Sequence, residues 1–99
     1  RFFLEISPMP VRIMIPGPFR RLAGGASEAE VEAATVYEAI RALEILAPGL
    51  RDRLTTADGD VRRFIRLYVN GKDIFEMCGA ETELRDGDTI EIVPAAAGG

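Results

Sequence analysis

The residues best placed to do chemistry are the last two, Gly98 and Gly99, which follow Pro94 and three alanines, Ala95, Ala96 and Ala97. Because glycine has no β-carbon, this tail is slim and can enter a narrow cleft of a partner protein. Its terminal carboxylate is a weak nucleophile that can attack an activated phosphate. With ATP the product would be an acyl-adenylate, from which a sulfur donor or an amine could displace AMP. The alternative is a frayed terminus without a function, since Gly-rich ends are common.

The composition excludes most other kinds of catalytic and metal site. The sequence has no His, so Ser–His triads, His metal ligands and imidazole general bases are absent. Its single Cys, Cys78, cannot form an internal disulfide or a zinc site of several thiolates, which favours a cytoplasmic protein. We therefore expect no metal and no bound cofactor. Any ATP and sulfur donor would be bound by a partner enzyme, which supplies the phosphate-stabilising groups that this chain lacks.

The charge and the hydropathy of the chain also limit its partners. The 16 acidic residues outnumber the 12 basic ones, for a net charge of −4. We therefore expect no nucleic-acid partner, because phosphate binding needs clustered positive charge. No apolar run approaches the roughly 20 residues that span a bilayer, so we expect no membrane partner either.

Alternating apolar residues predict the strands of a sheet that would carry the tail. The Glu residues that alternate with Ala and Val in the second segment favour an edge strand. Asn70-Gly71 is a strong two-residue hairpin signal, after which the chain is expected to pair back. The strands are expected at residues 11–15, 27–33, 64–69, 74–77 and 89–93.

One helix is predicted between the second and third strands. Thr35 and Glu38 form a capping box, and Pro48-Gly49 ends the helix after Ala47. Residues 19–25 are expected to be a loop, and residues 50–54 a short helical turn. The helix face expected to pack on the sheet carries Val36, Ala39, Ile40, Leu43, Leu46 and Ala47.

This order of elements predicts an α+β protein with two layers, in which one main helix covers one face of a mixed sheet of four to five strands. The first and last strands are expected to be central and mutually parallel, as in the ubiquitin-like β-grasp. We expect the domain to span residues 11–93, and the tail to span 94–99 because Pro94 cannot continue a central ladder. Residues 1–10 are expected to be an extension from a tag or an upstream start. The alternative is an ordered segment that covers apolar surface.

The sheet face away from the helix is predicted to dock a partner protein. Apolar and aromatic residues rimmed by charge are typical of interfaces, and Tyr and Arg are favoured anchors. The alternatives are a scatter of ordinary surface residues or cover by residues 1–10. Of the other candidates, Cys78 is expected to be a small buried hydrophobe, and Lys72 an exposed turn cation. The predicted face carries Arg12, Met14, Phe64, Arg66, Tyr68, Glu91 and Val93.

Three blocks of the sequence resemble the MoaD/ThiS family of ubiquitin-like sulfur carriers. The resemblance spans residues 11–99 and rests on residues 64–74 (FIRLYVNGKDI), 84–88 (LRDGD) and 90–99 (IEIVPAAAGG). It implies that an E1-like enzyme adenylates Gly99 with ATP and that sulfur replaces the hydroxyl oxygen. A sulfur-accepting synthase, of the cysteine synthase type or a molybdopterin synthase large subunit, would then use the thiocarboxylate.

The same resemblance implies a protein co-substrate rather than an enzyme, or the small non-catalytic subunit of a synthase. Met14, Phe64, Arg66, Tyr68 and Val93, together with the three alanines of the tail, would then bind the partners. Two other functions stay open. The chain could be a modifier that is joined to lysines through Gly99, or a binding module that forms no covalent bond.

Overall fold

The computed structural model describes residues 10–94 of the 99-residue chain. The extension predicted for residues 1–10 lies outside the described residues, except for Pro10, which belongs to the first strand. The strands are β1 (Pro10–Met14), β2 (Glu28–Glu32), β3 (Ile65–Val69), β4 (Lys72–Asp73) and β5 (Thr89–Pro94). The helices are α1 (Gly17–Arg20), α2 (Val36–Leu46) and α3 (Arg51–Leu54). Short 3-10 turns are η2 (Arg21–Ala23), η3 (Pro48–Leu50), η4 (Ile74–Glu76) and η5 (Gly79–Glu81).

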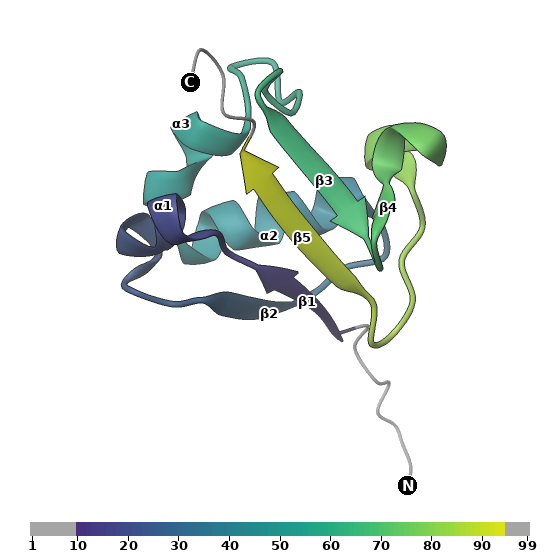
Figure 1. Ribbon diagram of the computed structural model, residues 1–99, viewed down its shortest axis with the longest axis horizontal. Helices are drawn as coiled ribbons and strands as arrows, with labels where there is room; N and C mark the ends of the chain where they lie inside the picture. The colour runs from purple at the N-terminus through teal and green to yellow at the C-terminus, as the bar shows by residue number, and fades with distance from the viewer. Residues whose placement is uncertain (1–9, 95–99) are drawn as a thin grey trace, which may run out of the picture.

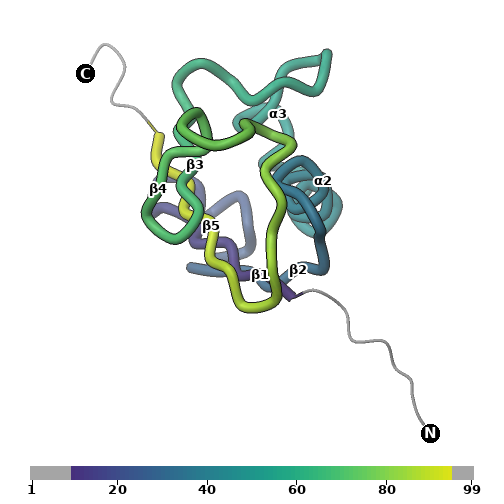
Figure 2. Tube along the Cα trace, turned by 90° about the vertical axis from the view of Figure 1, so that its right-hand side faces the viewer, coloured from purple at the N-terminus to yellow at the C-terminus, as the bar shows by residue number. Residues whose placement is uncertain are grey.

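The five strands form one mixed sheet in the order β2-β1-β5-β3-β4. β1 and β5 pair in parallel, while the other neighbouring pairs are antiparallel. The long helix α2 lies behind the sheet in Figure 1 and to one side of it in Figure 2. The predicted α+β fold, with central parallel first and last strands and β2 at an edge, is therefore confirmed.

The capping box fixes the start of α2. The Thr35 hydroxyl accepts the Glu38 backbone N–H at 3.2 Å, and the Glu38 carboxylate accepts the Ala34 N–H at 2.9 Å. Such a cap typically stabilises a helix by about 1 kcal/mol. The helix then buries Val36, Ala39, Ile40 and Leu43 against the sheet, where the core side chains include Ile13, Leu67, Ile90 and Ile92.

The end of α2 differs from the prediction. Leu46 was expected to face the core, but it is 64% exposed, and its neighbour Ile45 is 75% exposed. Leu50 and Leu54 of the next turns are almost fully buried and belong to the same core cluster. Their side chains fill the core after the helix, so Leu46, the last helical residue, is left outside. The predicted short helical turn at residues 50–54 is confirmed as the end of η3 and α3.

The loop predicted for residues 19–25 is wrong for its first part, which is helical. Pro18 stands in the first turn of α1, where proline needs no N–H partner and its fixed φ suits a helix. Phe19 is buried in the core, which anchors the turn. The chain then turns at Gly24 and Gly25, both at positive φ, a conformation that glycine adopts readily.

The hairpin at Asn70-Gly71 is confirmed, but its second strand is shorter than predicted. Asn70 (φ 51°) and Gly71 (φ 90°) adopt left-handed conformations, and β4 pairs back at Lys72 and Asp73 only. Residues 74–76 form η4 instead of a strand, because the Asp73 carboxylate accepts the Phe75 N–H at 2.9 Å and turns the chain. Cys78 follows in this connector and is exposed, so its predicted burial is wrong.

Pro94 is the last residue of β5 rather than the first residue of the tail. It lies opposite Ile65 of β3, one position beyond the pair formed by Val93 and Arg66. Backbone groups of a strand alternate between its two neighbours, and the Thr89 carbonyl faces β3, where it accepts the Asn70 N–H. Residues 91 and 93 therefore also face β3, and the nitrogen of Pro94 is directed toward the β1 side. The ladder between β1 and β5 ends at Met14 and Glu91. The missing N–H of Pro94 therefore removes no ladder hydrogen bond.

Candidate functional site

The end of β5 is the point from which the predicted tail departs. β5 lies between β1 and β3 in the middle of the sheet (Figure 1), and its last residues, beyond the Met14–Glu91 pair, are held by β3. The predicted tail residues Ala95, Ala96, Ala97, Gly98 and Gly99 lie outside the described residues. What the structure establishes is the position and support of the strand that precedes them.

The sheet face away from α2 carries six of the seven residues predicted for docking. They alternate with buried core residues along β1, β3 and β5, which places them on the opposite face. The register puts Met14 beside Glu91, Glu91 opposite Tyr68, and Val93 opposite Arg66. The six residues are Arg12, Met14, Arg66, Tyr68, Glu91 and Val93, and we call this surface the open face.

The open face combines half-buried apolar side chains with exposed charges. Met14, Tyr68 and Val93 are half-buried, whereas Arg12, Arg66 and Glu91 are exposed. In Figure 2 the sheet and α2 stand side by side, and no described helix or strand covers the opposite side of the sheet. The arrangement suits a protein interface. That a partner binds there stays a prediction.

Phe64, the seventh predicted docking residue, lies outside β3. It belongs to the turn before Ile65, so strand alternation does not place it on the open face. Its side chain is 57% exposed. Because Ile65 lies opposite Pro94, Phe64 is one residue from the position where β5 ends. It therefore lies next to the departure point of the tail.

Two ion pairs border the open face. Arg66 Nη1 lies 3.2 Å from Asp73 Oδ2, and Arg12 Nε lies 3.8 Å from Glu28 Oε1. The Arg12–Glu28 pair is exposed on both sides and contributes about 0–1 kcal/mol to stability, because water screens it, whereas the Asp73 side chain of the other pair is only 12% exposed. Their main effect is to orient the two guanidinium groups beside the half-buried Met14 and Tyr68.

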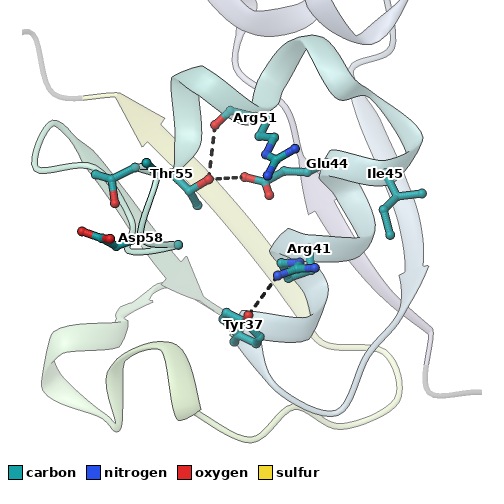
Figure 3. Close-up of a pocket in the computed structure, with 10 residues that line it drawn as sticks. Tyr37, Arg41, Glu44, Ile45, Arg51, Thr55 and Asp58 are labelled. Carbon is teal, nitrogen blue, oxygen red and sulfur yellow. Dashed lines mark hydrogen bonds between the residues drawn. The ribbon is translucent and has the colours of Figure 1, made fainter.

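A polar hollow of about 240 Å³ lies on the other side of the molecule, between α2 and residues 55–59 (Figure 3). The Thr55 hydroxyl donates to Glu44 Oε2 at 2.7 Å, and both residues are buried. Arg41 donates to the Tyr37 hydroxyl at 3.0 Å and stands 5.7 Å from the centre of its ring. These groups bond to one another, which is typical of a structural role.

The prediction did not single out Glu44, although a signal was present. Glu44 comes four residues after Ile40 and one after Leu43, on the edge of the inward helical stripe. An acidic residue at such a position needs a buried hydrogen-bond partner, which Thr55 supplies.

Neither a metal cluster nor a membrane-spanning helix occurs in residues 10–94. No three His, Cys, Asp or Glu side chains are grouped to hold a metal ion there. Within the same range, the helices are too short or too polar to cross a bilayer.

Comparison with known proteins agrees with this geometry. The model of the ThiS family matches residues 13–99, which include every strand from β1 to β5 except the first residues of β1. The chain belongs to the ThiS family. The MoaD/ThiS resemblance of the sequence is thereby confirmed.

Relatives of the chain include sulfur carriers and a protein modifier. It is 34% identical over 93 residues to the sulfur carrier protein CysO of Mycobacterium tuberculosis, which covers 92% of this chain and 100% of that protein. It is also 38% identical over 66 residues to small archaeal modifier protein 3 of Haloferax volcanii, covering 67% of this chain and 71% of the modifier. The relatives are thus small carriers and modifiers of the ubiquitin-like type.

Solved structures support the same relationship. The chain resembles a chain from the BexX/CysO complex of Amycolatopsis orientalis with a TM-score of 0.82 and 40% identity. The match covers 90% of this chain and 99% of that one. The fold is therefore the β-grasp of ubiquitin-like sulfur carriers, and that neighbour was solved as a complex of CysO with BexX.

Proposed function

We propose that the chain carries sulfur as a thiocarboxylate on Gly99. The observation that carries the proposal is the central strand β5, which ends at Pro94 and is followed by five small residues ending in Gly98-Gly99. The sulfur-carrier relatives support the same use of the chain. The chain itself would act as a co-substrate and not as an enzyme.

The proposed chemistry takes two steps in the active site of an E1-like partner. The Gly99 carboxylate attacks the α-phosphate of ATP, which gives an acyl-adenylate and releases pyrophosphate. Hydrosulfide then attacks the acyl carbon and displaces AMP, which leaves the thiocarboxylate. The partner would supply the groups that bind ATP and stabilise the charge on phosphate, and the carrier would supply the carboxylate and a surface that positions it.

The open face and Phe64 are the surface that we propose for this positioning. Met14, Tyr68 and Val93 offer half-buried apolar contacts, and Arg66 offers a charged anchor held by Asp73. These four residues lie on β5 itself or on the strands that pair with it, β1 and β3. A partner that binds this face therefore holds the point from which the tail departs.

We propose a cysteine synthase type of enzyme as the acceptor of the sulfur, because the last block of the sequence resembles carriers that deliver sulfur for cysteine synthesis. A molybdopterin synthase large subunit is the alternative acceptor. The two are distinguished by incubating the thiocarboxylate form with each enzyme and its substrates, and by following the loss of sulfur from the carrier.

Intact-protein mass spectrometry tests the central step. The full chain is incubated with ATP, sulfide and an E1-like enzyme of this family. The expected product is heavier by the mass difference between sulfur and oxygen, and a variant without Gly99 serves as the control. An unchanged mass with Gly99 present, under conditions in which the enzyme thiolates another carrier, contradicts the proposal.

Conjugation to lysines is a second candidate function, favoured by the similarity to a small archaeal modifier. In that case an amine would displace AMP from the same acyl-adenylate and form an amide with Gly99. The expected sign is a set of lysine-linked adducts that disappear when Gly99 is deleted. Thiocarboxylate formation without such adducts would restrict the chain to sulfur transfer.

A further inference from the structure

The edge of the sheet beside β3 is only partly covered. β4 pairs with β3 at Tyr68 and Val69, and the chain then turns into η4. The Asn70 N–H donates to the Thr89 carbonyl on the β5 side, so the alternate residues Leu67 and Val69 direct their backbone groups toward the β4 side. At Ile65–Leu67 no strand of the described region pairs on that side, and the Ile65 N–H there donates to the Arg62 carbonyl at 3.0 Å. An edge of this kind can pair with an extended segment of another chain.

An apolar groove lies beside this edge. Its volume is about 280 Å³, and β3 contributes Ile65 and Leu67 to its wall. Phe75 of η4 also lines it and is 75% exposed, although its ring is one of the largest apolar groups of the chain. The other lining residues are Asp60, Val61, Ile74 and Ala80. The backbone of β3 at this edge, which could pair with another strand, therefore lies beside a groove that could hold an apolar side chain.

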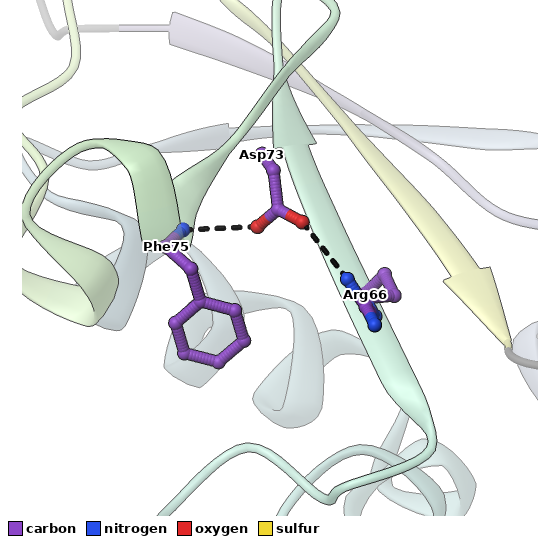
Figure 4. A network of polar contacts seen from close by, with 3 residues as sticks. All are labelled: Arg66, Asp73 and Phe75. Atoms are coloured by element: carbon purple, nitrogen blue, oxygen red, sulfur yellow. Dashed lines mark hydrogen bonds and ion pairs between the residues drawn. The ribbon is translucent and has the colours of Figure 1, made fainter.

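Hydrogen bonds hold Phe75 in this exposed position. One oxygen of the Asp73 carboxylate accepts the Phe75 N–H at 2.9 Å, and the other accepts Arg66 Nη1 at 3.2 Å (Figure 4). At the far end of the connector, the buried Thr82 hydroxyl accepts the Cys78 N–H and donates to the Gly79 carbonyl. Hydrogen bonds thus fix both ends of the connector between β4 and β5, and they hold the Phe75 side chain in its exposed position.

Among the residues that line the groove or directly follow a lining residue, three are acidic, and Arg62 is the one basic residue outside the Arg66–Asp73 ion pair. Asp60 is the one charged residue among those that line the groove, and the exposed Glu76 and Glu81 directly follow the lining residues Phe75 and Ala80. Arg62, which is close in sequence, donates from Nε to the Asp52 carbonyl at 2.6 Å. Arg66 is paired with Asp73. A ligand with positive charges on both sides of its apolar anchor is therefore favoured.

We propose that this edge binds an extended segment of a partner protein, in which one apolar side chain is flanked by Lys or Arg. The segment pairs with β3 through the Ile65 carbonyl and the Leu67 N–H, places its apolar side chain against Phe75, and directs a basic side chain toward Asp60. This surface, which we call the edge groove, is distinct from the open face, because Ile65 and Leu67 point away from it. The inference does not depend on the chemistry of Gly99.

Titration of the ¹⁵N-labelled full chain with a synthetic peptide tests the proposal. The probe is acetyl-Lys-Leu-Val-Leu-Lys-amide, with acetyl-Asp-Leu-Val-Leu-Asp-amide as the charge control. The Lys peptide is expected to give saturable shifts at the amides of Ile65–Leu67 and Phe75, and to slow hydrogen exchange at Leu67. The Asp peptide is expected to bind at least about tenfold more weakly, a difference of one unit in log Kd.

Matched variants decide whether the groove is responsible. Phe75→Ser is expected to weaken binding about tenfold or more, as for an aromatic anchor. Ile45→Ser, on α2, removes an equally exposed apolar side chain and is expected to have no effect. Asp60→Lys is expected to reverse the preference between the two peptides. Shifts centred on the open face, equal binding of both peptides, or unchanged binding to Phe75→Ser would overturn the proposal.

Discussion

The two faces of the sheet are made from the same strands but contain different kinds of contact. On the helix side, Ile13, Leu67 and Ile90 are at most 2% exposed and belong to one apolar cluster. On the open face, their neighbours Met14, Tyr68 and Glu91 are half-buried or exposed, and ion pairs stand at the rim. Since side chains alternate along a strand, one residue step separates a core position from a surface position. Stability and partner binding should therefore be separable within a single strand.

The largest expected effect is on the helix side of β3. Leu67→Ala removes a side chain that is 2% exposed, which should reduce the free energy of unfolding by about 2–5 kcal/mol through lost burial and the cavity left behind. Urea unfolding followed by circular dichroism measures the change. A decrease in the free energy of unfolding of less than about 1 kcal/mol would contradict the conclusion that the helix side of β3 provides stability.

The next largest effect is expected from two aromatic residues, one on the open face and one in the turn before β3. The double variant Phe64→Ala/Tyr68→Ala should keep most of its stability, because Phe64 is 57% exposed and Tyr68 is half-buried. Adenylation by an E1-like partner should nevertheless become at least about tenfold less efficient, as expected when aromatic anchors of an interface are removed. Pyrophosphate release measures the adenylation rate.

Leu67→Ala provides the control for this second prediction. At a temperature at which it is fully folded, it should be adenylated at the wild-type rate, because its side chain points away from the open face. A wild-type adenylation rate in the double variant, or an equal loss of rate in the double variant and in Leu67→Ala, would contradict a docking role for the open face and Phe64.

Local patterns were sufficient to predict most of the fold. Alternation places the core residues of β1, β3 and β5, the Thr35–Glu38 box starts α2, and Asn70-Gly71 fixes the hairpin. Each of these signals acts within a few residues, and each agrees with the tertiary contacts. The six residues of the open face follow from the same alternation, which is why they could be named without the structure.

The features that could not be predicted depend on what neighbouring elements do. Pro94 remains in β5 only because the ladder with β1 has already ended at Met14. Leu46 is exposed because Leu50 and Leu54, which come later in the chain, occupy the core. The turn at residues 74–76 replaces a strand because Asp73 caps it. The edge groove follows from that same turn, so no sequence pattern indicated it.

The smallest expected effect concerns the rim of the open face, where Arg12 lies 3.8 Å from Glu28 and both side chains are more than half exposed. Arg12→Gln keeps much of the side-chain length and removes the charge. The free energy of unfolding should change by no more than about 0.5 kcal/mol, because exposed ion pairs of this kind contribute little. Urea unfolding of both proteins measures the change in the free energy of unfolding, which should be the same at low and at high salt.

The same variant should affect partner binding through the association rate. A rim charge steers the encounter between two proteins, so its loss changes the rate and its salt dependence more than the lifetime of the complex. Stopped-flow association with the E1-like partner at several salt concentrations would show a flatter dependence for Arg12→Gln than for the wild type. Faster dissociation of the complex, with an unchanged salt dependence of the association rate, would contradict this. Arg12 would then lie in the centre of the contact and not at its rim.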